Sequence, residues 1–252
     1  MARAADVEAI ERATLQAVAP AVVEALPGWL LPMDSGTVGR ARSAVPLHHA
    51  APDLGLLASI LARYEARGFT PALRLPDLPA FVPFQQALRQ QGFVRQQPTL
   101  TQTAPIEALL NVESDPAAVL ADAPDAAWMA MFLGEGLDPV DGASRARSLS
   151  RATGTRYASL RENGQTLACG AASFGHGWLG VHGMRTAAAQ RGRGLAGRLL
   201  RAMAREAAQH GIPQAFLQVD ASNAPALALY QRLGFSTAWA YAYWRRPDPA
   251  SV

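Results

Sequence analysis

RGRGLAGRLLRAMAREAAQHG, residues 191–211, is the stretch that decides the fold, because a glycine-rich loop leads directly into an amphipathic segment. Apolar residues recur at positions 195, 199, 200 and 203, which is the spacing of one face of a helix. Gly211 is the kind of residue that ends a helix. The spacing therefore predicts a helix over residues 194–210, preceded by a tight loop.

This loop has the chemistry of an anion site. Gly192 and Gly194 have no side chains, so the backbone can approach a ligand closely. The first N–H groups of the following helix have no partners within it, and the helix dipole adds positive potential there. Arg191 and Arg193 supply two positive charges. We expect the loop to bind a pyrophosphate.

The segments around the loop predict an antiparallel meander followed by a helix and two strands. Residues 155–160, 166–174 and 178–186 are expected strands, joined by tight turns at Asn163-Gly164 and at 175–177. Helices are expected at residues 125–133 and 144–151, and after the loop we expect a strand at 215–219, a helix at 225–233 and a strand at 236–244. Glycines 192, 194 and 197 also satisfy the dinucleotide fingerprint, but that motif requires parallel βαβ units around it.

A faint internal repeat divides the chain. YEARGFTPALRL (64–75) followed by FQQALRQQGF (84–93) resembles AAQHGIPQAFLQV (207–219) followed by ALALYQRLGF (226–235). Both copies are predicted as helix, glycine stop, short strand, helix and Gly-Phe, which indicates a duplication. We expect an N-terminal lobe at residues 1–103, a linker rich in Ala, Pro and Asp at 104–124, and a second domain at 125–252.

The first half carries weaker signals. Residues 7–26 are predicted helical with a break near Pro20, residues 28–33 and 37–45 are predicted as a hairpin around Gly36, and residues 54–66 are predicted helical. Residues 47–56, LHHAAPDLGL, have no glycine pair and no arginine, so we expect no anion loop there. His48 and His49 alone make a poor metal site.

Residues 125–246 resemble the GNAT superfamily, the Gcn5-related N-acetyltransferases. Their coenzyme A signature, Arg/Gln-x-x-Gly-x-Gly/Ala, is matched by residues 191–196, and their later signature, Asn-x-x-Ala-x-x-Leu-Tyr-x-x-x-Gly-Phe, by residues 223–235 (NAPALALYQRLGF). The whole chain is similar to two-part members whose first half is a degraded copy. The resemblance implies an α/β (α+β) fold of tandem GNAT-type lobes, each a mixed, mostly antiparallel sheet flanked by helices.

The resemblance also implies a function and a set of site residues. The expected reaction moves the acetyl group of acetyl-CoA, a co-substrate, to an amine of a small molecule or peptide by direct attack. Tyr230 is the expected proton donor to the leaving thiolate and a cofactor contact. The other expected cofactor-binding residues are Met184, Arg185 and Thr186 at a strand end, Arg191, Gly192, Arg193, Gly194, Leu195, Ala196 and Gly197 in the loop, and Asn223. Ala188 and Gln190 depart from the residues common in the family, without affecting cofactor binding.

The general base stays open between Glu135, His182, Asp220 and water. His182 can equally be a hydrogen-bonded histidine of the sheet, and Asp220 can equally be a cap for the following helix. An aromatic acceptor pocket is one interpretation, and core packing the other, of four residues: Trp128, Trp178, Tyr241 and Tyr243. A coenzyme A-binding sensor or scaffold without turnover is the alternative function, which the retained Asn223 and Tyr230 disfavour.

Composition narrows the remaining classes. The chain has 252 residues, half of them hydrophobic, and a net charge of +3 in which every basic residue is an arginine. No dense basic stripe is present, although Arg245 and Arg246 are adjacent, so nucleic acid is not an expected partner. The single Cys169 excludes an intrachain disulfide and a multi-cysteine metal site, and no metal is expected. We expect a cytoplasmic monomer or homodimer without membrane contact, whose partners are acetyl-CoA and an amine acceptor.

Overall fold

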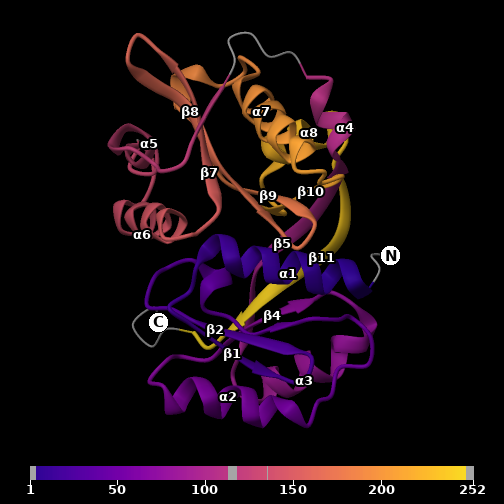
Figure 1. The fold of residues 1–252 in the computed structure, drawn as a ribbon. Coiled ribbons are helices and arrows are strands. Elements are labelled where there is room, and N and C mark those ends of the chain that lie inside the picture. Colours follow the sequence, from indigo (N-terminus) through magenta and orange to yellow (C-terminus); the bar gives the residue numbers. More distant parts are fainter. Residues whose placement is uncertain (1–3, 113–117, 135, 248–252) are drawn as a thin grey trace.

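The computed structural model describes residues 4–112, 118–134 and 136–247 (Figure 1). Over these residues the strands form two sheets. The larger runs in the order β4 (Ala72–Pro76), β11 (Ser236–Arg245), β5 (Val94–Pro105), β10 (Gln214–Asp220), β9 (Trp178–Thr186), β8 (Gln165–Gly175), β7 (Thr155–Glu162) and β6 (Val119–Ala121). The smaller contains β1 (Val22–Leu26), β2 (Trp29–Met33) and β3 (Val45–Pro46), and a bridge between Ala44 and Leu73 joins it to β4.

The second half follows the predicted order. Helices α5 (Ala126–Ala130) and α6 (Pro139–Ser150) precede the meander β7–β8–β9, and α7 (Leu195–Gln209), β10, α8 (Ala224–Arg232) and β11 follow it. α5 begins at Asp125, whose carboxylate accepts a hydrogen bond from the Trp128 N–H at 2.9 Å. α6 begins before the predicted residue 144, because Asp138 caps it and Pro139 starts it.

The first half repeats the second. Its helix α2 (Leu56–Ala66), strand β4, helix α3 (Val82–Gln90) and strand β5 match α7, β10, α8 and β11 in order. The helix ends make equivalent hydrogen bonds: the Phe93 N–H donates to the Leu88 carbonyl at 3.0 Å, and the Phe235 N–H donates to the Tyr230 carbonyl at 3.0 Å. The predicted duplication of a helix–strand–helix–strand unit is present in this order of elements.

Two predictions for the first half are wrong. The helix expected at 7–26 is α1 (Ala4–Val18), and residues 22–26 form strand β1 instead. The hairpin turns at Gly28, which has a φ of +74°, and not at Gly36. Asp34 accepts a hydrogen bond from the Gly36 N–H at 2.7 Å, and this local turn bends the chain out of the strand expected at 37–45. That segment contains the short helix η1 (Gly39–Ala41) instead.

The halves exchange their last strands. β5, from the first half, lies between β10 and β11 and is antiparallel to both. β11, the last strand of the chain, lies between β5 and β4 and pairs with both, and in Figure 1 this yellow strand runs from the upper half into the lower half. The segment predicted as a linker, residues 104–124, carries α4 (Ile106–Leu110) and β6 where it is described, and the domain boundaries stay a prediction.

Buried side chains follow this exchange. One core lies between α7 and the strands β7–β10, and a second lies under α2 and α3. Trp244, on β11, belongs to the second core with Trp29 and Phe84 of the first half. Among the described residues, no helix has both the length and the apolar character required to cross a bilayer.

Trp244→Ala should lower the free energy of unfolding by about 3 to 5 kcal/mol, because it opens a cavity in the core of the first half. Urea denaturation measures this loss. Trp178→Ala is the matched control, since Trp178 is partly exposed beside Phe216 and should cost clearly less. An equal loss in the two variants would contradict the assignment of Trp244 to the core under α2 and α3.

Candidate functional site

The site begins where two neighbouring strands separate. β9 and β10 are parallel, and they pair only over residues 178–181 and 214–217. A register shift between β8 and β9 places a bulge at Gly183, whose φ is +59°. A Cβ on Gly183 would lie 2.5 Å from Leu149 and 3.0 Å from Phe132, so only glycine fits there. Beyond Val181 the edge of β9 that faces β10 has no strand partner.

A cavity of about 350 Å³ occupies the opening between the strands. Both halves line it. From the second half come His182, Met184, Arg185, Asp220, Asn223 and Tyr230, and from the first half come Val38, Gly39, Arg40, Gln97 and Thr99. Tyr243 and Arg245 of the exchanged strand β11 complete this set. Thr186 and the loop 191–197 are not in the lining, so the predicted cofactor residues form two groups, joined by the end of β9.

The glycine-rich loop has the predicted geometry. Gly192 and Gly194 have φ values of +80° and +74°, and a Cβ on either would meet nothing within 4 Å. Glycine is therefore needed there for the left-handed backbone, and the space outside the loop is open. The first N–H that bonds within α7 belongs to Arg198, which donates to the Gly194 carbonyl at 3.3 Å. The N–H groups of Leu195, Ala196 and Gly197 precede it and have no acceptor within the helix.

The loop side chains divide into charged and packing residues. Arg193 contacts Gln190 and lies 3.7 Å from Glu162, whereas Arg191 makes no ion pair in the described part of the chain. Gly197 has a different function from the two glycines before it. A Cβ on Gly197 would lie 3.1 Å from Val112, so its missing side chain allows α7 to pack closely.

The second motif places two polar groups on α8. Asn223 caps the helix, and its Oδ1 accepts a hydrogen bond from the Ala226 N–H at 3.3 Å. Tyr230 is 8% exposed, packs edge-on against Phe235 and lines the cavity. Burial raises the pKa of Tyr230, and the positive charge of Arg185 opposes part of that rise. Its hydroxyl therefore keeps its proton at neutral pH.

The candidates for a general base have different surroundings. His182 is 4% exposed, lies 3.0 Å from the Ser173 hydroxyl, and has its pKa lowered to about 3, first by burial and then by the charge of Arg40. It is therefore a neutral histidine of the sheet. Asp220 lines the cavity, and its Oδ1 accepts hydrogen bonds from the Ser222 N–H (2.9 Å) and hydroxyl (2.6 Å). Glu135 lies outside the described residues.

The aromatic pocket is only partly present. Of the four aromatic residues considered, Tyr243 lines the cavity. Trp128 is buried and donates to the Ala158 carbonyl, Trp178 packs on Phe216, and Tyr241 packs under α1. The sequence pattern of β11 could not tell that Tyr243 lines the cavity while Tyr241 packs in the core, because both are aromatic residues of the same strand.

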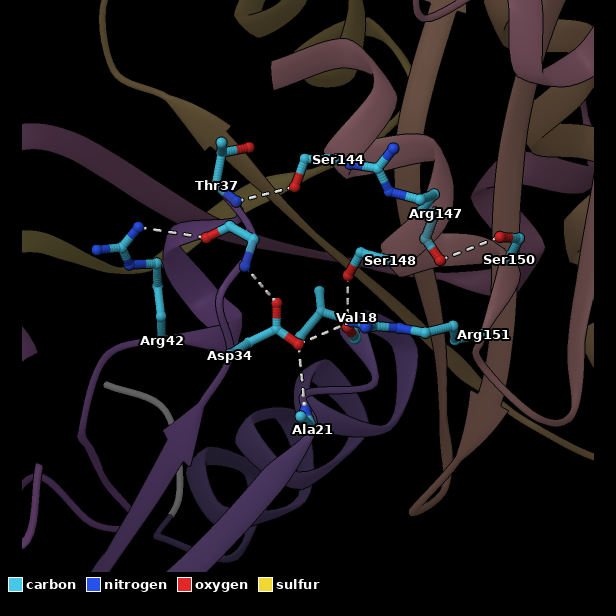
Figure 2. Close-up of polar contacts among 11 residues, drawn as sticks. Val18, Ala21, Asp34, Thr37, Arg42, Ser144, Arg147, Ser148, Ser150 and Arg151 are labelled. Carbon is cyan, nitrogen blue, oxygen red and sulfur yellow. Dashed lines mark hydrogen bonds and ion pairs between the residues drawn. The ribbon is translucent and has the colours of Figure 1, made fainter. Parts of the chain in front are cut away.

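The first half is fastened to the second beside the cavity, as Figure 2 shows. The Thr37 N–H donates to the Ser144 hydroxyl at 2.8 Å, and the Ser148 hydroxyl donates to the Val18 carbonyl at 2.5 Å. Arg151 pairs with the buried carboxylate of Asp34 at 2.8 Å. These bonds hold the segment with Val38, Gly39 and Arg40 over the opening. No sequence motif surrounds Val38, Gly39 and Arg40, so the sequence did not identify them individually as cavity residues.

His182→Gln should make the protein less sensitive to acid. In the unfolded chain His182 takes up a proton near its ordinary pKa of 6.5, but in the fold only near 3. The contribution of neutral His182 to the free energy of unfolding is therefore complete above pH 6.5. It decreases as the pH falls below 6.5, by about 2 kcal/mol at pH 5. Urea unfolding at pH 7 and pH 5 should show that loss reduced in His182→Gln but kept in His210→Gln, an exposed control. An unchanged acid loss in His182→Gln would contradict the neutral assignment.

Comparison with known proteins shows the family. Residues 4–244 match the family model described as "Probable histone acetyltransferase Rv0428c C-terminal". A mycothiol acetyltransferase of Corynebacterium aurimucosum is 43% identical over 58 residues, a match that spans 23% of this chain and 19% of that protein.

Solved structures share the fold over nearly the whole chain. A GCN5-related N-acetyltransferase from Kribbella flavida has a TM-score of 0.68 at 18% identity, covering 96% of both chains. A tandem GNAT protein from the clavulanic acid biosynthesis pathway has a TM-score of 0.58 at 17% identity, covering 95% of this chain and 94% of that one. These two structures confirm the predicted tandem GNAT-type fold. Because the family model spans almost all of the described residues, the chain belongs to this acetyltransferase family.

Proposed function

We propose that the chain transfers the acetyl group of acetyl-CoA to an amine of a small molecule or peptide, by direct attack of the amine. The observation that carries this proposal is the opening between β9 and β10, with Tyr230 on its wall and the N-terminus of α7 beyond it. Acetyl-CoA supplies an activated thioester whose sulfur leaves as a thiolate. The residues of the chain bind it, orient it and supply the proton.

The residues present fit the cofactor. A pyrophosphate needs several N–H donors and positive charge, and the N-terminus of α7 offers both beside Arg191 and Arg193. The extended pantetheine arm carries amides, which need backbone partners. Residues 184–186 lie on the part of β9 that β10 does not cover, so the backbone groups that point to this edge are available to the pantetheine amides. The Asn223 side chain, at the start of α8, adds an amide donor on the opposite wall.

Tyr230 is proposed as the acid. Its buried hydroxyl stays protonated and lines the cavity, so it can donate a proton to the sulfur as the C–S bond breaks. Asp220 is proposed as the group that accepts the amine proton, directly or through water. It lines the cavity, and in the described chain Ser222 engages only its Oδ1. His182 is too weakly basic for this role, because its pKa is about 3.

The first half is proposed to bind no acetyl-CoA. Its helix α2 corresponds to α7, but α2 starts at Gly55, where the Asp53 carboxylate accepts the Gly55 N–H at 2.9 Å. A carboxylate at this helix start repels phosphate groups and already uses a donor. One cofactor per chain is therefore expected.

Saturating acetyl-CoA should raise the melting temperature of the wild-type protein by mass action, and titration calorimetry should give one site per chain. Gly194→Val should abolish both signals, because it places a branched side chain in the space outside the loop. Gly211→Val is the matched control. Gly211 has a φ of +66° with nothing within 4 Å of its Cβ, so this variant adds similar strain at the other end of α7. If acetyl-CoA still raised the melting temperature of Gly194→Val, the glycine-rich loop would not be the cofactor site.

Tyr230→Phe should lower kcat by roughly 10²-fold, with little change in the KM for acetyl-CoA, because it removes the proton donor and keeps the ring. Release of free thiol, measured with an amine for which chemistry limits the rate, gives kcat. Tyr157→Phe is the control, since Tyr157 is a buried tyrosine of β7 whose hydroxyl donates to the Leu149 carbonyl. Equal kcat values in wild type and Tyr230→Phe would rule out the acid role, and binding without any turnover would favour a coenzyme A sensor.

A further inference from the structure

The cavity wall carries more positive than negative charge. Four arginines and two aspartates line it, and the histidine there is neutral. Arg145 forms an ion pair with Asp141 at 2.5 Å. Among the described residues no carboxylate lies within ion-pair distance of the other three arginines, Arg40, Arg185 and Arg245, although the chain has almost as many acidic as basic residues.

Arg245 is held in place by its neighbours. Its guanidinium stacks on the Tyr243 ring at 4.3 Å. Gly39 of the first half packs against both, since a Cβ on Gly39 would lie 2.6 Å from the Arg245 Nη2 and 2.8 Å from the Tyr243 ring. Burial lowers the pKa of Arg245, and the nearby positive charge of Arg42 adds to this effect. The side chain is therefore oriented and partly desolvated, yet no carboxylate of the described residues forms an ion pair with it.

Arg40 lies at the inner part of the same wall. Its Nε is buried without a hydrogen-bond partner in the described chain. After burial, its positive charge is the second cause of the lowered pKa of His182, and it opposes part of the rise that burial causes in the pKa of Tyr241. It also acts on the buried carboxyl of Glu11, but that carboxyl is already paired with Arg74 at 2.7 Å. Partly buried charges without partners are costly, so two such arginines on one cavity wall indicate that an anion completes the site.

That anion belongs to the acceptor by position. Arg40 comes from η1 of the first half and Arg245 from β11, whereas the residues proposed for acetyl-CoA lie on β9, α7 and α8. We propose that the acceptor is a small amine that carries an anionic group, and that Arg40 and Arg245 bind this group; the inference rests on the proposed acetyl transfer. A guanidinium pairs with a carboxylate through two parallel hydrogen bonds, which also fixes the orientation of the amine.

The charge and the size of the cavity both restrict the acceptor. A volume of about 350 Å³ is near the lower end for a ligand pocket, and the acetyl end of the cofactor must share it. A lysine-rich peptide would bring further positive charge to a wall that is already positive, and the repulsion would weaken its binding. A small anionic amine meets both conditions.

The test compares matched acceptors with the wild-type chain. α-Amino acids are each paired with the corresponding carboxamide, and aminoalkyl phosphonates, a neutral monoamine and a lysine-rich peptide are added. Thiol release with acetyl-CoA gives kcat/KM for each. We expect the acids to exceed their carboxamides by at least about 10-fold, the effect of roughly 1.4 kcal/mol of selective binding. Faster phosphonates than carboxylates would identify the anion as a phosphoryl type.

Two variants assign the preference to residues. Arg40→Gln and Arg245→Gln should each lower kcat/KM for an anionic acceptor by about 10- to 100-fold, mainly through its KM, and leave the KM for acetyl-CoA unchanged. The values for the carboxamides should stay nearly constant. Arg246→Gln is the matched control, because Arg246 pairs with Glu65 at 3.5 Å, stacks on Phe93 and does not line the cavity.

The possible outcomes distinguish failure of the anionic-acceptor inference from failure of the proposed acetyl transfer. Carboxamides or the lysine-rich peptide acetylated as fast as the acids would overturn the anionic acceptor and leave the acetyl transfer standing. A raised KM for acetyl-CoA in both arginine variants, with unchanged acceptor preference, would assign the arginines to the cofactor and also overturn it. Absence of turnover with every amine, while acetyl-CoA still raises the melting temperature, would contradict the proposed function itself.

Discussion

The separation of β9 from β10 after Val181 and Leu217 is the constraint on which the site depends. The bulge at Gly183 turns β9 away from its neighbour and leaves backbone groups without strand partners in the middle of a sheet. Unpaired buried backbone groups are costly, so such an edge is stable where a ligand or water can pair with it. The same separation opens the cavity and places the ends of β9 and α8 on opposite sides of it.

Because the two halves exchange their last strands, the first half contributes residues to the wall of this cavity. β5 contributes Gln97 and Thr99, and β11 contributes Tyr243 and Arg245. Removing either strand would remove part of the cavity wall and would leave the neighbouring strand of the other half without a hydrogen-bonding partner on one edge. A fully buried ion pair between Glu11 and Arg74, at 2.7 Å, ties α1 to β4 near the same place. The degraded copy therefore shapes the site even though it lacks the glycine-rich loop.

The cavity contains buried groups that are neutral and arginines that stay charged. His182 and Tyr230 are both buried, and both are held in their neutral forms, one by a lowered and one by a raised pKa. The arginines keep their charge because the ordinary pKa of a guanidinium lies far above neutrality. The cavity thus combines neutral groups that can donate or accept hydrogen bonds with fixed positive charge, which supports the proposed anionic acceptor and the proposed acid.

The sequence by itself determined what is set by local interactions. The glycine-rich loop, the helix after it and the duplicated order of α2–β4–α3 and α7–β10–α8 could all be predicted, because each depends on residues close along the chain. The cap of α8 was expected from Asp220, but Asn223 supplies it, and Asp220 bonds to Ser222 instead. The turn at Gly28 was missed, since residues 22–26 fit the end of a helix and a strand alike until the partner strand at 29–33 is present.

Only the tertiary structure decided that both halves line the cavity. β5 pairs with β10, so Thr101 lies opposite Gln218 although they are far apart in the sequence. Arg40 and Arg245 meet at one wall through the same exchange, and neither has a local signature. Such contacts depend on strand pairing between distant segments. The free energy of this pairing comes from burial of the whole sheet, so no short stretch of residues predicts it.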